Sequence, residues 1–445
     1  MTRTALLLCL GIGLFAPDAP SFAQAADPLP LERALTEALQ ANPSLQAARA
    51  GADASASGVD AVRAAWYPRI SFVEGWQRGN QPIFVFSSLL ASRRFAASNF
   101  AIDQLNHPDP LGYFHATTSI EQLVIDGGAR RAAVDQALAS KQGAEQGVRE
   151  AAHALAAGVT EAYGRVLAIQ AERKAAAAAL DAGREDLARA RRRRDAGLAT
   201  EADVLALAVH VADMEQRVVQ ADGDTVIARA HVNRLTGAPI DRVFEAVEPA
   251  GMVEASLPAL TALLAEAEQN RPDLARAEAA TRGADSARRA ARSAFLPRVA
   301  AQAAFDVSGT RFTDRASSWL VGGEVRWSLA LAGAEKAQLT AATAAVTRAR
   351  AEREDLRAQV QVDVVSAVQR LQTARARQAV GRATVEQARE SQRIVRDRYD
   401  AGLAPVNDLL RAATAVLDAE ARRTAAFVDA LTARAQLDRA LGRQP

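Results

Sequence analysis

Residues with reactive side chains are scattered along this chain rather than grouped at spacings that support catalysis or metal binding. The five histidines show neither an i,i+4 pair nor a carboxylate partner at ligand spacing; they are His107, His115, His153, His210 and His231. No nucleophile elbow, phosphate-binding loop or paired-carboxylate arrangement stands out. The sequence therefore predicts a protein that is not an enzyme and that has no cofactor or metal.

Charged residues follow two similar turns. Asp203 lies six residues after Gly197, and Asp408 lies six residues after Gly402, each in the first turns of a predicted helix. A negative charge at that position stabilises a helix by about 0.3–1 kcal/mol, so a purely structural role would explain both. The run 191–194 holds four arginines just before the first turn, and such a run is more typical of a solvated helix face than of a binding site.

The elements that carry these turns occur twice in the chain. Residues 195–205 match 400–410 at an offset of 205, and residues 42–69 match 271–298 at an offset of 229. The difference, 229 − 205 = 24, places an insertion of 24 residues in the first copy between Pro68 and Gly128. The sequence therefore predicts an internal twofold repeat.

Each copy contains a long segment without proline. The segments from 128 to 197 and from 333 to 402 each span 69 residues, and a helix of that length would be about 100 Å long. Both show the apolar spacing of a coiled coil, at Leu155, Val159, Ala162, Val166 and Ile169 and at Val360, Val364, Ala367 and Leu371. The shorter helices 197–237 and 402–442 would return along them, stacked end to end with helices at 31–65 and 260–294. The pattern predicts a tall helical wall.

Four strands are predicted between the helices. Apolar and polar residues alternate after Pro297, in a first series at Val299, Ala301, Ala303, Phe305 and Val307 and a second at Trp319, Val321, Val325, Trp327 and Leu329. The first copy alternates at Phe114, Ala116, Thr118 and Ile120, and less cleanly at Ile70, Phe72 and Trp76, where Glu74 falls on the apolar side. Two strands per copy, each pair joined by a polar loop, give four strands.

Composition excludes two classes of protein. The chain has 54 Lys and Arg against 52 Asp and Glu, which is too balanced for a nucleic-acid binder. No run of 18 apolar residues follows the N-terminus, which excludes a helical membrane protein. Residues 1–25 are typical of a secretory signal peptide, so the mature chain would begin near Ala26. Cys9 lies inside its apolar run rather than at a cleavage point, which argues against a lipid anchor.

Ten-residue alternating strands in an exported protein are typical of an outer-membrane β-barrel, although a soluble sheet capping a coiled coil is an alternative. Single-chain barrels begin at about eight strands, so closure would need two or three copies, and a polar inner wall favours three. Of 21 aromatic residues, 15 lie in the windows 66–114 and 295–327. The aromatics predicted at the membrane interface are Trp66, Tyr67, Trp76, Tyr113, Phe114, Phe295, Trp319 and Trp327.

At this point the chain resembles the TolC-like outer-membrane efflux proteins over essentially its whole mature length. Three features carry the resemblance: the duplicated Asn/Arg-Pro-x-Leu … Pro-Arg segment, the Asp-Gly-Gly-Ala-Arg-Arg junction at 126–131, and the Ala-Gly-Leu-Ala-x-x-x-Asp-(Val/Leu)-Leu turns at 196–205 and 401–410. Each is modest alone, but their order and duplication are specific.

The resemblance implies a homotrimer in the bacterial outer membrane, with a 12-stranded barrel in the lipid and a 12-helix tunnel in the periplasm. It also implies two protein partners, a periplasmic adaptor (membrane fusion) protein and an inner-membrane pump that supplies the energy. The channel itself would be a passive exit duct of a tripartite efflux system. Export of proteins by a type I secretion system is the alternative use of such a duct, and a soluble periplasmic coiled-coil scaffold is a more distant alternative.

The resemblance also assigns roles to the two turns, which would be the periplasmic tips. The residues expected to dock the adaptor are Gly197, Leu198, Ala199 and Thr200 with Gly402, Leu403, Ala404 and Pro405. Asp203 and Asp408 would form the periplasmic gate. Arg411 stands where some family members have a second acidic residue, so it would join Asp408 in a mixed ring that is less selective for cations.

The predicted domains follow from this layout. They are a signal peptide at 1–25, periplasmic helices at 26–67, a β-hairpin with a long extracellular loop at 68–126, a long helical hairpin at 127–242, a linker and second-repeat helices at 243–296, a second β-hairpin at 297–331 and a second long helical hairpin at 332–445. The overall fold class is mainly α with a small β part.

Overall fold

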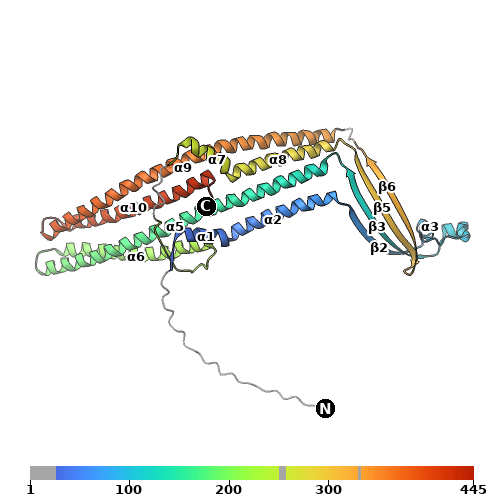
Figure 1. Ribbon diagram of the computed structural model, residues 1–445. Helices are drawn as coiled ribbons and strands as arrows, with labels where there is room; N and C mark the ends of the chain where they lie inside the picture. The colour runs from blue at the N-terminus through green and yellow to red at the C-terminus, as the bar shows by residue number, and fades with distance from the viewer. Residues whose placement is uncertain (1–26, 250–256, 329–331, 445) are drawn as a thin grey trace, which may run out of the picture.

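A computed structural model describes residues 27–249, 257–328 and 332–444. The molecule is elongated, with long helices along most of its length and a curved four-stranded sheet at one end (Figure 1). The predicted signal peptide at 1–25, the predicted mature start at Ala26 and Leu329 of the last alternating series lie outside the described residues.

Two helical hairpins form the wall. Helices α5 (Ala129–Asp195) and α9 (Ala334–Asp400) have 67 residues each, and the returning helices α6 (Glu201–Thr236) and α10 (Val406–Leu441) have 36 each. Helix α6 packs on α5, α5 packs on α10, and α10 packs on α9, so α6 and α9 lie at the two edges. At about 1.5 Å per residue the long helices reach about 100 Å, as their lack of proline predicts.

Shorter helices complete the wall between the returning helices and the sheet. They are α1 (Leu31–Ala41), α2 (Pro43–Arg63), α7 (Leu260–Asn270) and α8 (Pro272–Ser293). At the break between α1 and α2, the Asn42 side chain accepts hydrogen bonds from the backbone N–H groups of Ser44 and Leu45 and donates one to the carbonyl of Leu235 in α6. Helix α1 contacts α6 and α7 contacts α10, which confirms the predicted end-to-end stacking.

Glycine permits this close stacking. Gly237, which ends α6, has φ +72°, and a Cβ there would lie 2.8 Å from the carbonyl oxygen of Ala41. Gly442 ends α10 with φ +68°, and its Cβ would lie 2.6 Å from the carbonyl oxygen of Asn270. A side chain would be excluded at both joints by the left-handed backbone and by the neighbouring helix end.

The core follows the seams between the helices. On α5, Val159 and Val166 are fully buried against α1, α6 and the nearby short strands. On α9, Val364 and Leu371 are fully buried against α7 and α10. These residues belong to the coiled-coil spacing that predicted the long helices. Among the described helices, none is both long and apolar enough to span a membrane.

The sheet contains β2 (Arg69–Gly79), β3 (Leu111–Ile125), β5 (Arg298–Arg311) and β6 (Asp314–Arg326) in the order β2-β3-β5-β6, with all neighbours antiparallel. These are the four strands that alternation predicts. The described chain also contains two strands that were not predicted, β1 (Asp27–Leu29) and β4 (Phe244–Ala246), which pair in parallel beside α5. The predicted count of four strands is therefore wrong, because it leaves out the two short strands of this second sheet.

The segment between β2 and β3 is more ordered than the loop that the sequence predicts. It forms α3 (Pro82–Ala91), the 3-10 turn η2 (Ala97–Phe100) and α4 (Ile102–Asn106), and it lies beyond the far end of the sheet (Figure 1). Two arginines attach it to the β5–β6 hairpin. Arg94 lies 3.0 Å from the carboxylate of Asp314, and Arg93 donates to the carbonyl of Ser317. A second 3-10 turn, η1 (Ala64–Trp66), connects α2 to β2.

Candidate functional site

Both long hairpins reverse through the same backbone motif. Gly197 and Gly402 each have φ +77°, the left-handed conformation that glycine adopts at low cost. The N–H groups of Leu198 and Leu403 each donate to the carbonyl five residues earlier at 2.8 Å, which is the long bond of a Schellman motif. The two leucine side chains remain 71% and 70% exposed. Each tip therefore presents an apolar side chain to solvent on a rigid turn.

The predicted gate residues have different surroundings. The carboxylate of Asp203 accepts hydrogen bonds from the N–H and the hydroxyl of Thr200, whose hydroxyl accepts from the N–H of Asp203. This capping box begins α6 and engages Asp203 locally. Asp408 and Arg411 are exposed on α10, where Pro405 holds the cap position, and neither forms an ion pair within the described chain. The other predicted tip residues, Ala199 and Ala404, are half-buried.

Contacts that sequence reasoning missed join the two hairpins behind the tips. The buried carboxylate of Asp186 on α5 pairs with Arg189 on the same helix and lies 3.3 Å from the guanidinium of Arg396 on α9. Arg193 donates to the carbonyl of Tyr399, and its guanidinium lies 5.4 Å from the centre of that ring. Burial raises the pKa of the Tyr399 hydroxyl. No sequence signal could have found the contacts between α5 and α9, because their members are more than 200 residues apart.

The composition of the arginine run before the first tip favours a solvated helix face, but the four side chains have different surroundings. Arg191 and Arg192 are exposed, whereas Arg193 binds α9 and Arg194 pairs with Asp195 and Glu201. Apolar side chains pack beneath these pairs in a cluster shared by both hairpins: Leu187, Ala190, Val204, Leu207, Tyr399, Val406 and Leu409. The tips are therefore held together from within one chain.

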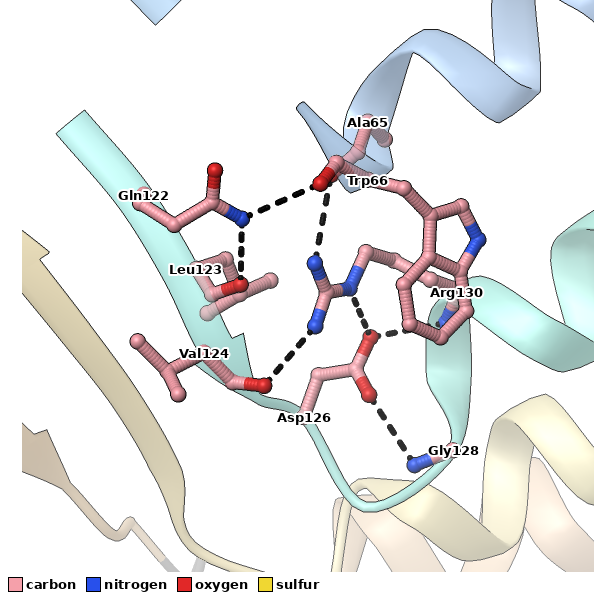
Figure 2. Close-up of polar contacts among 8 residues, drawn as sticks. All are labelled: Ala65, Trp66, Gln122, Leu123, Val124, Asp126, Gly128 and Arg130. Carbon is pink, nitrogen blue, oxygen red and sulfur yellow. Dashed lines mark hydrogen bonds and ion pairs between the residues drawn. The ribbon is translucent and has the colours of Figure 1, made fainter. Parts of the chain in front are cut away.

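The sheet joins the helical wall at a buried polar node (Figure 2). The carboxylate of Asp126, just after β3, accepts from the N–H groups of Gly128 and Arg130 and pairs with the Arg130 Nε at 2.9 Å. The Arg130 guanidinium also donates to the carbonyls of Ala65 and Val124. Burial alone would raise the pKa of Asp126, but the hydrogen bonds outweigh it and hold the pKa below its usual value.

The indole of Trp66 covers the other side of this node. The guanidinium carbon of Arg130 lies 4.4 Å from the centre of the Trp66 ring, and both Asp126 and Arg130 are less than 10% exposed. The node connects η1, the end of β3 and the start of α5 through one guanidinium. Part of the 126–131 motif that the sequence singles out is therefore a structural joint.

Alternation gives the sheet one apolar and one polar face. Phe72, Phe305 and Trp319 lie on one face at the same level, with Thr118 between them in the register, and the three aromatic side chains are 65%, 49% and 77% exposed. The opposite face is mainly polar, although Val73 and Leu320 are also exposed on it. On this face Ser71 bonds to Ser119, and the hydroxyl of Thr117 donates to Asp306. A sheet with this division of exposed side chains is suited to lipid on one side and water on the other.

Most of the predicted interface aromatics lie towards the two ends of the strands. Near the helices, Trp66, Tyr67 and Trp327 are exposed, and the Trp327 indole donates to the carbonyl of the half-buried Phe295. At the other end, Trp76 and Phe114 lie beside each other on the apolar face, and Tyr113 points to the polar face because it is the neighbour of Phe114. Trp319 is on the apolar face near the middle of β6, level with Phe72 and four residues nearer the helices than Trp76, so the structure places it away from the strand ends.

One charged residue on the apolar face of β2 has an explanation. The carboxylate of Glu74 lies 2.8 Å from the guanidinium of Arg315 on β6, and that guanidinium lies 4.0 Å from the centre of the Phe312 ring. Neutralisation by Arg315 accounts for the break that Glu74 makes in the apolar alternation.

The histidines do not form a metal site in the described part of the chain. His107 does have a carboxylate partner, since Asp103 lies four residues before it at 3.5 Å, so the expectation of no such spacing was wrong. Both side chains are exposed. No group of three or more potential ligands was found among the described residues.

Comparison with known proteins decides the family. The family model described as "Outer membrane efflux protein" matches residues 34–238 and 263–443, which is well over half of the chain. The chain belongs to the outer membrane efflux protein family. Comparison with curated protein sequences finds no match.

Solved structures share the fold of this outer membrane efflux protein. The CmeC outer membrane channel of Campylobacter jejuni has 15% identity and a TM-score of 0.79, with 93% of this chain and 86% of that chain covered. The outer membrane protein VceC of Vibrio cholerae has 21% identity and a TM-score of 0.76, with 93% and 96% covered. The open state of the MtrE outer membrane channel of Neisseria gonorrhoeae has 19% identity and a TM-score of 0.73, with 93% and 88% covered.

The family assignment gives the molecule an orientation. This outer membrane efflux protein is located in the outer membrane, with a large periplasmic part. The amphipathic sheet is the part suited to lipid. The two Gly-Leu turns lie at the end of the molecule opposite the sheet (Figure 1).

Proposed function

We propose that three copies of this chain form the exit duct of a tripartite efflux system. The observation that carries the proposal is the sheet. It has one exposed apolar face and one polar face, and its edge strands β2 and β6 are each paired on one side only within the described chain. Unpaired edges next to lipid are costly, and three copies of four strands would close into a barrel of twelve that is wide enough for a pore.

The helical wall supports the same assembly. Its two edge helices carry exposed apolar side chains, Val209, Val219 and Val226 on α6 and Val362, Val365, Val380 and Ile394 on α9. Exposed apolar stripes on both edges are suited to pairing between copies, α6 of one against α9 of the next. Three walls joined in this way would form a periplasmic tunnel of twelve helices that continues the barrel.

The tips supply the docking surface for the periplasmic adaptor. Leu198 and Leu403 protrude from two similar turns that the cluster beneath them holds together. Paired apolar knobs on a rigid support fit the helical hairpin of an adaptor, which would connect the duct to an inner-membrane pump. The duct would be passive, and the pump would provide energy and select the cargo.

The assembly is tested with the full-length chain expressed in a Gram-negative bacterium. We expect a heat-modifiable trimer in the outer-membrane fraction that forms channels in planar lipid bilayers. Val219→Asp combined with Val380→Asp should yield monomers, whereas Ile240→Asp, which changes an exposed apolar residue in the loop after α6, should leave the trimer intact. A soluble wild-type monomer would refute the assembly and would favour a periplasmic coiled-coil scaffold instead.

Docking is tested on the same trimer. Leu198→Asp combined with Leu403→Asp should abolish cross-linking to the adaptor and export, without changing trimer yield, and Ile240→Asp again serves as the matched control. Unchanged cross-linking in the tip variant would show that the adaptor binds elsewhere. Restoration of protein export rather than small-molecule efflux, in strains lacking one or the other duct, would assign the chain to a type I secretion system.

The gate gives a separate prediction. Asp408 and Arg411 are exposed near the tip without partners in the described chain, so in a trimer they would line the mouth and pair between copies when it is closed. Asp408→Ala or Arg411→Ala should raise single-channel conductance in bilayers. Because Asp203 caps α6, Asp203→Ala should instead lower stability by about 1 kcal/mol. If neither α10 variant changes the conductance, these two residues do not form the gate.

A further inference from the structure

The helical wall contains a groove that none of the roles above uses. It has a volume of about 1090 Å³ and is lined by residues from all four long helices, α5, α6, α9 and α10. A volume of this size is at the upper end of the range for sites that bind small organic molecules. We call it the inner-wall groove.

The groove lies on the side of the wall opposite to the one that the short elements cover. On α5, Val159 and Tyr163 face α1 and the β1–β4 pair, whereas Glu161, Arg165 and Ala168 line the groove. Positions 161, 165 and 168 are about half a turn around the helix from position 159. In a closed ring of three walls, the covered side would face the periplasm and the hollow side would face the tunnel.

Basic side chains dominate the rim of the groove. The ionised residues among those lining it are four arginines and two acids, which gives 4 − 2 = +2 per chain: Arg165, Arg234, Arg370, Arg377, Glu161 and Asp429. All six are exposed. Three copies around one axis would place +6 at the same level of the tunnel, and charge concentrated in a cleft raises the local concentration of the opposite ion.

The side chains of these arginines make few interactions with other described residues. Arg377 lies 4.0 Å from Asp429, and Arg370 makes a single 3.5 Å hydrogen bond to Gln436. The guanidinium groups of Arg165 and Arg234 have no hydrogen bond or ion pair to another described residue. A free guanidinium keeps its charge at any physiological pH and can bind a carboxylate or sulfonate through two N–H groups at once.

Part of the groove lining is apolar. Ile227 and Leu235 of α6 and Val428 of α10 line it together with a series of alanines. A groove lined by both apolar side chains and guanidinium groups is complementary to a molecule that has an apolar body and a negative charge.

The geometry points to the inner-wall groove as a binding site for amphipathic organic anions on their way through the tunnel, so that the duct favours anionic cargo. This inference rests on the proposed function, because the groove faces a tunnel only in the trimer. Arg165 and Arg234 would bind the anionic group, and Ile227, Leu235 and Val428 would contact the apolar body.

The test uses purified full-length trimer in planar bilayers. Ion selectivity is measured from the reversal potential in a KCl gradient, and binding from the block of the current by 8-anilinonaphthalene-1-sulfonate. The uncharged N-phenyl-1-naphthylamine has the same aromatic body without the sulfonate and serves as the matched probe. Wild-type channels should prefer chloride to potassium and should be blocked by the sulfonate at concentrations at least tenfold lower than by the uncharged probe.

The variant that removes the site is Arg165→Gln combined with Arg234→Gln. It should reverse or abolish the anion preference and weaken the sulfonate block about tenfold or more, as expected for the loss of charge-assisted hydrogen bonds. The control is Arg33→Gln combined with Arg49→Gln, which removes the same charge from the covered side of the wall, where Arg49 donates to the carbonyl of Leu39 in α1.

The outcomes separate the two proposals. A conducting trimer that prefers potassium, or that both probes block equally, overturns the anion site and leaves the duct in place. Equal changes in the groove variant and the control also overturn it, because the effect would then come from net charge alone. A chain that forms no trimer and no channel overturns the proposed function and this inference with it.

Discussion

Removal of the Arg130 guanidinium should weaken the connection between the sheet and the helical wall. Arg130→Ala would leave the Asp126 carboxylate without its ion pair and would leave the carbonyls of Ala65 and Val124 without their donor. It would also remove the cation from the face of Trp66. All of these groups lie at one joint, so the substitution affects three elements at once.

The loss of stability in Arg130→Ala depends on how well the Asp126 carboxylate remains bound. Breaking a buried ion pair by removing one partner costs about 3–5 kcal/mol. The backbone N–H groups of Gly128 and of residue 130 still bind the Asp126 carboxylate, so we expect a value near the lower end of this range. With an unfolding entropy of about 2.1 cal/mol/K per residue, a loss of 3–5 kcal/mol per chain lowers the melting temperature by about 3–6 °C.

The assay is thermal unfolding of the purified protein in detergent, followed by circular dichroism. Arg131→Ala is the matched control, because Arg131 is the adjacent residue and is exposed, and it should change the melting temperature by less than about 1 °C. Arg130→Lys keeps the charge but not the planar fork and should fall between the two. Equal melting temperatures for Arg130→Ala and Arg131→Ala would refute the reasoning.

Two further predictions concern buried groups on α5. The Tyr163 hydroxyl accepts from the N–H of Val247 at 2.7 Å and can donate to the carbonyl of Leu29 or of Val247. Tyr163→Phe should therefore lower the free energy of unfolding by about 2 kcal/mol and the melting temperature by about 2 °C. A shift in melting temperature below about 0.5 °C would contradict this. Burial, and then two nearby arginines, lower the pKa of His153, so the unfolded chain binds a proton that the folded chain does not as the pH falls through about 6.5. Stability should therefore decrease from pH 7 to pH 5.5, and His153→Gln should reduce that decrease; equal pH profiles for the variant and the wild type would exclude His153 as the cause.

Much of the fold could be predicted because local patterns determine it. The 67-residue lengths of α5 and α9 follow from the absence of proline and from apolar residues at coiled-coil spacing. The break at Asn42 follows from a capping side chain placed directly before a proline. The four long strands follow from the alternation of apolar and polar residues, and the sequence also shows that Glu74 interrupts this alternation. Its partner Arg315 was not visible, because 241 residues separate the two.

The parts that could not be predicted depend on distant or very short segments. β1 and β4 have three residues each, which is too short for alternation to register. Helix α3 begins with Pro82 at its first position, a usual helix start, but it has only ten residues and a largely apolar sequence, which give no clear periodicity. The tie between Asp186 and Arg396 exists only because the two hairpins lie side by side.

The arginines of the inner-wall groove show why a binding site can be missed when each sequence segment is interpreted separately. Arg165 lies on α5, Arg234 on α6, and Arg370 and Arg377 on α9, and each alone is an exposed charge on a helix, for which a solvated face is the sound interpretation. That interpretation treats the water around each charge as bulk. The fold instead brings the four charges to one partly apolar groove, and closure of three walls into a tube would confine the water they share. Their repulsion, weak in open solvent, then strengthens, and an anion in the groove relieves it. The function proposed for them is thus a property of the assembled wall, which no single helix contains.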